Sequence, residues 1–231
     1  MAESLFKHTV KTVMIMATFT LVGTLGLAFI HEQSKGEIVV NEAIEKMKSF
    51  AQVLPANAYD NKLLEDFVNV PAGGELNNRD ATKIYVARLA GVATAVILET
   101  TAHDGYSGDI KLLMAVRNDG SISGVRVIAH KETPGLGDYI DILHGDWIKS
   151  FDHISLITRP SAQWKVKKDG GQFDYMAGAT ITPRAVVSIT QAALHYVEAN
   201  KAQLQSLPIV YCRMHWLVIL AQTISFFQSL R

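Results

Sequence analysis

The stretch TKIYVARLAGVATAVILETTAHDGYSGDIKLLMAVRNDGSISGVRVIAH, residues 82–130, decides the fold. It is rich in β-branched residues, and two of its apolar runs are separated by Arg117-Asn118-Asp119-Gly120. Asn or Asp next to Gly between such runs is typical of a hairpin. We therefore expect a largely antiparallel sheet, with strands at 82–89, 92–100, 108–116 and 124–130.

Helical patterns flank this sheet in the sequence. Apolar residues recur at helical spacing over 139–149 and over 183–205, which predicts two helices. Residues 59–80 are polar and are interrupted by Pro71-Ala72-Gly73-Gly74, which favours a loop with a short helical piece. The predicted fold class is therefore α+β, with a mainly antiparallel sheet flanked by helices.

The N-terminal end carries an uncharged run, TVMIMATFTLVGTLGLAFI, over residues 12–30. Its 19 residues approach the ~20 that span a bilayer as a helix. Lys7, His8 and Lys11 precede it, which places the stub 1–11 in the cytoplasm. The alternative is a cleaved signal peptide, but the run is long for one and no Ala-x-Ala site follows it. Residues 31–53 read as a helical stalk that leads to a domain at 54–207.

The C-terminal end, residues 208–231, is also apolar, but Arg213 and His215 interrupt it. The remaining apolar segment is at the lower length limit for a membrane span. An interfacial helix, a second span and a helix docked on a partner all stay open. We favour contact with the membrane surface or with another subunit.

Composition excludes several classes of protein. The formal net charge is zero, so no general attraction to nucleic acid is expected. Cys212 is the only cysteine, which rules out an intramolecular disulfide and an iron–sulfur cluster built from this chain alone. The eight histidines show no spacing typical of a zinc hydrolase, and we expect no metal site.

A loop that leads into a helix lies at Asp174-Tyr175-Met176-Ala177-Gly178-Ala179-Thr180. Thr182 is the expected N-cap of the helix, and Pro183 suits its first position. The free N–H groups of a helix start attract phosphate, and Gly178 and Ala179 let a bulky group approach the backbone. Thr180 is thus placed where a phosphate-bearing ligand could be held or esterified.

A second candidate stretch is His130-Lys131-Glu132-Thr133-Pro134-Gly135-Leu136-Gly137-Asp138. Its Pro-Gly-x-Gly core predicts a compact turn that bares the backbone. Such a turn can lie against a planar ring and offer it N–H and C=O groups, while Glu132 and Thr133 add side-chain hydrogen bonds. The alternative is a plain connection between a strand and a helix.

The two stretches together resemble a known family. The loop resembles the flavinylation motif of membrane-bound electron-transport flavoproteins, and the turn resembles their second signature. Gly105-Tyr106-Ser107-Gly108 and the segments 119–127 and 146–151 match as well. With the N-terminal anchor, the resemblance reaches to about Leu207 and is to the G subunits of Rnf-type ion-translocating electron transport complexes.

The resemblance implies a covalent cofactor. The family carries FMN through its phosphate on the last Thr of the motif, here Thr180, and Asp174 matches the acid that precedes it. Ala177 departs from the family's usual Ser or Thr. The residues implied in holding the cofactor are Thr180, Asp174, Ala177, Gly178, Ala179, Thr182, Glu132, Thr133, Pro134, Gly135, Leu136 and Gly137. Tyr106, Tyr139, Trp147 and Tyr175 are further candidates to stack on the ring, and Arg184 could screen the phosphate.

The implied function is that of a relay, because this chain offers no second redox group. It would pass electrons through FMN within a complex that couples NADH and ferredoxin chemistry to ion movement, as one subunit of an enzyme. Its implied partners are the other subunits, the membrane and a flavin transferase. Its domain would lie in the periplasm, on the bacterial inner membrane. The alternatives are the C subunit of a Na⁺-translocating NADH:quinone reductase and a membrane-anchored flavin-dependent sensor or assembly factor.

Overall fold

The computed structural model describes residues 2–73, 76 and 78–206 of the chain. Two compact units, residues 1–46 and residues 47–231, can be described separately. The tail at 208–231 lies outside the described residues.

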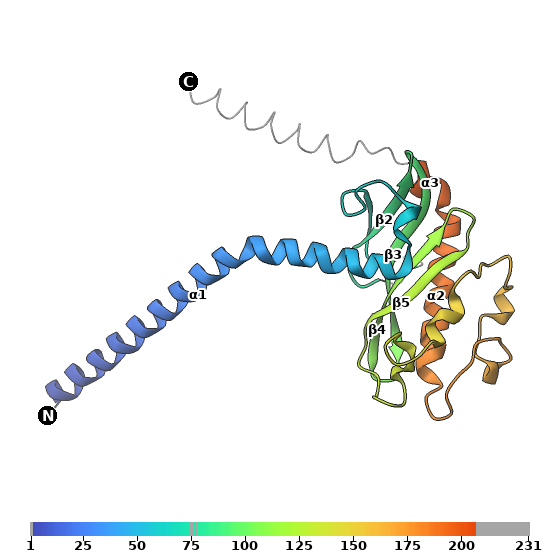
Figure 1. Ribbon diagram of the computed structural model, residues 1–231. Coiled ribbons are helices and arrows are strands. Elements are labelled where there is room, and N and C mark those ends of the chain that lie inside the picture. Colours follow the sequence, from blue (N-terminus) through green and yellow to red (C-terminus); the bar gives the residue numbers. More distant parts are fainter. Residues whose placement is uncertain (1, 74–75, 77, 207–231) are drawn as a thin grey trace, which may run out of the picture. The chain divides into compact units, whose positions relative to one another are not determined.

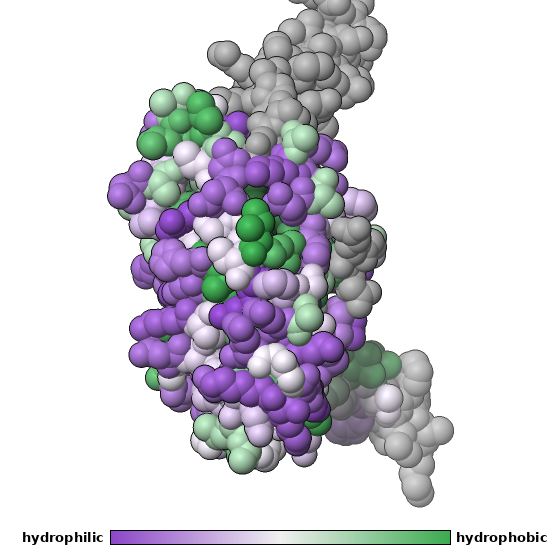
Figure 2. All heavy atoms as spheres, turned by 90° about the vertical axis from the view of Figure 1, so that its right-hand side faces the viewer, coloured by the Kyte–Doolittle hydropathy of each residue, from purple (hydrophilic) through white to green (hydrophobic). Residues whose placement is uncertain are grey.

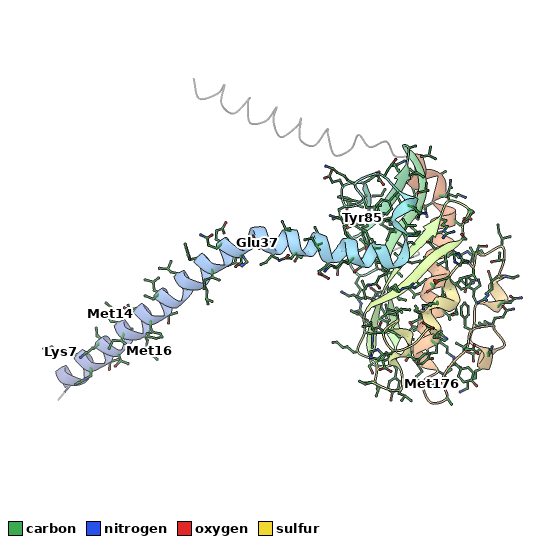
Figure 3. All side chains as sticks on the ribbon, viewed as in Figure 1. Lys7, Met14, Met16, Glu37, Tyr85 and Met176 are labelled. Carbon is green, nitrogen blue, oxygen red and sulfur yellow. The ribbon has the colours of Figure 1, made fainter. Side chains whose placement is uncertain are left out.

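Helix α1, Ala2–Val53, runs through 52 residues and makes up the whole first unit. Within the described residues, one helical segment is long and apolar enough to cross a membrane, Lys7–Ser34. Figure 3 shows Lys7, Met14 and Met16 along this part of α1. The segment contains the run expected to be the membrane helix, and the expected stalk continues it without a break. A single-pass membrane anchor fits this helix.

The second unit contains a five-stranded antiparallel sheet in the order β1-β2-β3-β4-β5. The strands are β1 Phe67–Val70, β2 Thr82–Leu89, β3 Val92–Gly105, β4 Gly108–Arg117 and β5 Ile122–Ala129. The expected antiparallel sheet is confirmed, and the turn at 118–121 joins β4 to β5. One strand was missed: β1 pairs with β2 in a region that was expected to be mostly loop.

Each face of the sheet has its own apolar core, because side chains alternate between the two faces along a strand. On β2, Ile84 and Val86 lie in one core, whereas Tyr85 and Ala87 lie in the other. All four side chains are buried. The sheet is therefore covered on both sides.

The last turns of α1 cover one face, and they belong to the second unit. Phe50, Val53 and Leu54 are each at most 2% exposed, and the Phe50 ring lies 4.9 Å from that of Tyr85. Gly124 of β5 makes this approach feasible. A Cβ there would lie 3.1 Å from the Val53 backbone. The compact domain thus begins at Met47, within the segment expected to be the stalk.

Helix α2, Ile181–Ala199, covers the other face and contacts β3 most extensively (Figure 1). Two helix predictions were wrong in detail. Asn200 separates α2 from α3, Lys201–Ser206, so residues 183–205 are not one helix. Residues 139–149 form no α-helix. This region holds two 3₁₀ turns, η3 Asp138–Ile140 and η4 Trp147–Phe151. The remaining short turns are η1 Ala56–Ala58, η5 Ser161–Gln163 and η6 Lys167–Asp169.

Candidate functional site

The loop at 174–180 closes on itself just before α2. The N–H of Ala179 donates to the carbonyl of Met176 at 3.0 Å, and these two residues form an isolated β-bridge. Gly178 has φ +89°, which favours glycine. Ala177 and Gly178 are exposed, whereas Ala179 is buried. Figure 3 shows Met176 at one end of the domain, far from Tyr85.

Thr180, not Thr182, is the N-cap of α2, so the N-cap prediction was wrong by two residues. Thr180 makes no capping hydrogen bond with its side chain, and no hydrogen bond of its hydroxyl is found within the described residues. Thr180 is 9% exposed. Since the first N–H groups of a helix have no partner inside it, this hydroxyl stands at an electropositive position.

Thr182 is only 1% exposed, and its hydroxyl donates to Oε2 of Glu132 at 2.6 Å. Glu132 is itself 4% exposed, and its Oε1 accepts the backbone N–H of Ser107 at 3.1 Å. Ser107 lies in the turn between β3 and β4. One buried carboxylate therefore joins three segments that are far apart in the sequence: the β3–β4 turn, the turn at 132–137 and the start of α2.

The turn at 132–137 uses its own N–H groups. Those of Leu136 and Gly137 donate to the carbonyl of Thr133, at 3.1 and 2.9 Å. The backbone of Gly135 holds the pKa of the nearby Asp138 carboxyl below its usual range. The N–H groups of Leu136 and Gly137 are therefore engaged within the turn, while contact of the turn with a ring stays a prediction. Its exposed part consists of the side chains of Thr133, Pro134 and Leu136 and the backbone of Gly135.

The turn and the loop lie against each other. A Cβ on Gly178 would meet Cδ1 of Leu136 at 3.7 Å, and nothing else described lies within 4 Å. A Cβ on Gly135 would meet nothing within 4 Å. Most of the residues predicted for the site are thus brought together, with open space beside two of their glycines.

Two of the four candidate aromatic residues, Tyr139 and Trp147, form hydrogen bonds with the backbone of the loop. The Trp147 Nε1–H donates to the carbonyl of Asp174 at 2.8 Å, and the Met176 N–H donates to the Tyr139 hydroxyl at 3.3 Å. The two rings pack edge to face at 5.7 Å. Burial raises the pKa of the Tyr139 phenol. These contacts assign Tyr139 and Trp147 to holding the loop, whereas Tyr106 and Tyr175 are exposed.

Charged side chains next to the loop are paired. Lys167 of η6 forms an ion pair with the exposed carboxylate of Asp174. Arg184 donates two hydrogen bonds to Asp169, each at 2.6 Å, which raises the pKa of the guanidinium and lowers that of the carboxyl. Arg184 is therefore engaged by Asp169 and does not turn freely toward Thr180. This second pair ties the segment that carries Lys167 to the first turn of α2.

An apolar rim is carried by the loop, the turn, the β3–β4 connection and the first residue of α2. We use this name for five side chains that are each 38–68% exposed: Tyr106, Leu136, Tyr175, Met176 and Ile181. On the side of the domain shown in Figure 2, the surface is mainly hydrophilic and its apolar side chains form small patches. Exposed apolar side chains on the segments that carry the site suit a planar, largely apolar group.

Sequence reasoning missed the contributions of Ser107, Asp138 and Lys167 to this arrangement. Ser107 lies within a stretch already noted as matching the family, so a signal was present. Asp138 follows the turn directly, but nothing in its spacing indicates that its carboxylate lies beside the backbone of Gly135. Among the described residues, no group of His, Cys, Asp and Glu could hold a metal ion.

The sequence of the chain is similar to those of known proteins over most of its length. Residues 105–195, which include the turn, the loop and most of α2, match the FMN-binding domain family. The chain is 43% identical over 194 residues to the G subunit of the ion-translocating oxidoreductase complex of Pseudomonas aeruginosa, covering 84% of this chain and 91% of the relative. It is 39% identical over 199 residues to the corresponding protein of Vibrio atlanticus, covering 86% and 95%. The chain belongs to the family of the G subunits of ion-translocating oxidoreductase complexes.

Proposed function

We propose that this chain is an FMN-carrying subunit of a membrane-bound, ion-translocating oxidoreductase complex, with the FMN phosphate esterified to Thr180. Family membership and the FMN-binding domain support a flavoprotein within such a complex. The observation that carries the covalent assignment is the Thr180 hydroxyl. It has no hydrogen bond among the described residues and stands at the start of α2, next to the loop that carries part of the apolar rim.

The residues present fit the cofactor. Within the described residues no hydrogen bond is found for the N–H groups of Ile181 and Thr182 at the start of α2, and such groups suit a phosphodiester. Gly178 exposes its backbone, and a Cβ there would lie 3.7 Å from Cδ1 of Leu136 and occupy the space between the loop and the turn. The apolar rim suits the isoalloxazine ring, and the exposed backbone of Gly135 leaves room beside the turn.

The attachment is a phosphoryl transfer. The Thr180 oxygen attacks the phosphorus of FAD that belongs to its FMN half, and a new P–O bond forms. The bond from this phosphorus to the bridging oxygen breaks, AMP leaves with the electron pair, and the hydroxyl proton passes to a base. A Mg²⁺-dependent flavin transferase would supply that base and the metal. Thr180 acts as a nucleophile in this step only.

Bound FMN supplies the ability to take up and release one or two electrons. The chain's own residues would keep it in place: Thr180 holds the phosphate, and the apolar rim shields the ring from water. Trp147 and Tyr139 fix the loop that carries the tether. The subunit would then relay electrons between other redox subunits of the complex, which couples NADH and ferredoxin chemistry to ion movement.

The covalent assignment is tested by the mass of the detergent-extracted chain. We expect a gain of one FMN less one water, located by tandem mass spectrometry on Thr180 within the tryptic peptide 169–184. Thr180→Val should abolish flavin fluorescence in a denaturing gel, whereas Thr180→Ser, which keeps the hydroxyl, should retain it. Fluorescence of equal strength in Thr180→Val would contradict the assignment.

The proposed topology places residues 1–11 in the cytoplasm and the domain in the periplasm. A reporter that is active only in the periplasm should work when it is fused after Ser206. Moving Lys7 and Lys11 to the other end of the apolar run, by exchange with His31 and Gln33, should reduce that activity. An active cytoplasmic reporter at Ser206 of the parent chain would refute this orientation.

A further inference from the structure

The contacts of Glu132 are unusual for an exposed turn. Its carboxylate is nearly inaccessible to solvent, and both of its oxygens are used: Oε1 by the Ser107 N–H at 3.1 Å and Oε2 by the Thr182 hydroxyl at 2.6 Å. A buried carboxylate that accepts two hydrogen bonds makes strong, charge-assisted contacts. Each carboxylate oxygen of Glu132 thus accepts a hydrogen bond from the protein itself.

Gly137 shows how tightly these groups are packed. A Cβ at this position would lie 3.0 Å from Glu132 Oε2, 3.1 Å from Glu132 Cβ and 3.2 Å from the Thr182 hydroxyl. Gly137 has φ −105°, so its backbone does not require glycine, but a side chain there would force Glu132 or Thr182 to shift. The turn therefore closes directly onto the start of α2.

We propose that Glu132 is a positioning residue for the flavin ring. By holding Thr182 and Ser107, it fixes the turn at 132–137 relative to Thr180, two residues before Thr182, and so fixes Leu136 relative to the tether. The inference rests on the proposed function. It assigns Glu132 and Thr182, which the family motif counts among residues near the cofactor, to the wall of the site and not to direct contact with FMN.

The test compares Thr182→Val, Thr182→Ser and Thr190→Val in the full-length chain in detergent. Thr190 is a matched control, because it is equally buried on α2 but its hydroxyl donates to Val186 within the helix at 2.7 Å. All three variants should keep covalent FMN. In Thr182→Val, the flavin absorption bands and midpoint potential should shift, while Thr182→Ser and Thr190→Val should match the parent.

A second readout needs no flavin. In the flavin-free chain produced without transferase, amide exchange at Ser107 should be faster by about tenfold or more in Thr182→Val, since one charge-assisted hydrogen bond of the cluster is lost. Thr190→Val should leave this amide unchanged. An unchanged flavin spectrum and potential in a folded Thr182→Val variant would overturn the proposal, and so would loss of covalent FMN in that variant. If the parent itself carried no FMN, the proposed function would fail, and unchanged exchange at Ser107 would separately overturn the role of Glu132.

Discussion

Replacing Phe50 by Ala should destabilise the domain strongly. Phe50 is 1% exposed and packs with Tyr85 in the core between the end of α1 and the sheet. Removing a buried Phe side chain costs about 3–5 kcal/mol, which includes the cavity it leaves. At about 2–4 °C per kcal/mol for a domain of this size, the expected fall in unfolding temperature is roughly 6–20 °C.

The assay is thermal unfolding of the full-length chain in detergent, followed by intrinsic tryptophan fluorescence. All three tryptophans lie outside α1, and two of them, Trp147 and Trp164, are in the described part of the domain, so the signal reports on the domain. Ile44→Ala is the matched control. Ile44 is on the same helix but 47% exposed, and its loss should shift the unfolding temperature by no more than about 2 °C.

If Phe50→Ala lowers the unfolding temperature by less than about 3 °C, the assignment of the last turns of α1 to the domain is refuted. The same reasoning predicts that a chain beginning at residue 47 keeps the stability of the second unit. A chain beginning at residue 54 should lose it, since the cover over Tyr85 is then missing. Equal unfolding temperatures of the two chains would contradict this reading of the core.

Two further predictions concern the site and the pH dependence of stability. Gly135→Val should keep covalent FMN but shift the flavin absorption spectrum, because the side chain enters open space beside the turn; φ +74° adds strain, so Gly135→Ala is the control for that strain alone. Asp152 is half-buried, and burial raises the pKa of its carboxyl although Arg126 lies 3.8 Å away. Because the raised pKa means that the folded state disfavours the ionised form, Asp152→Asn should stabilise the domain at pH 7, and the gain should disappear as the pH falls toward about 4. Denaturant unfolding at both pH values measures this difference, and a gain that is the same at both would contradict it.

The sheet could be predicted because its strands are apolar runs rich in β-branched residues and one pair is joined by Asn-Asp-Gly. Strand β1 could not, because it is four residues long and is recognisable only by its pairing with β2. The predicted helix at 139–149 failed for a different reason. Ile140 and Ile148 are both buried, but they lie on two separate 3₁₀ turns, η3 and η4. Their helical spacing in the sequence therefore does not come from one helix.

The site shows a similar division. The resemblance predicted that the loop and the turn belong to one site, and the structure places Gly178 of the loop beside Leu136 of the turn. The sequence could not predict what each of these residues contacts. The bond between Glu132 and Thr182 joins positions 50 residues apart, and no local pattern encodes it. Likewise, an exposed Pro-Gly-x-Gly turn looks open in sequence, whereas the N–H groups of Leu136 and Gly137 donate to the Thr133 carbonyl within the turn.

The two threonines at the start of α2 differ in a way that bears on which of them could carry the proposed FMN ester. Within the described residues the hydroxyl of Thr180 makes no hydrogen bond, whereas that of Thr182, which is 1% exposed, donates to the Glu132 carboxylate at 2.6 Å. A phosphoester formed on Thr182 before folding would bring an anion against Glu132 and would need space that the core does not have. Such a mismodified chain could not reach the native state. The fold itself would thereby disfavour an ester at Thr182, whereas it leaves the proposed position, Thr180, available.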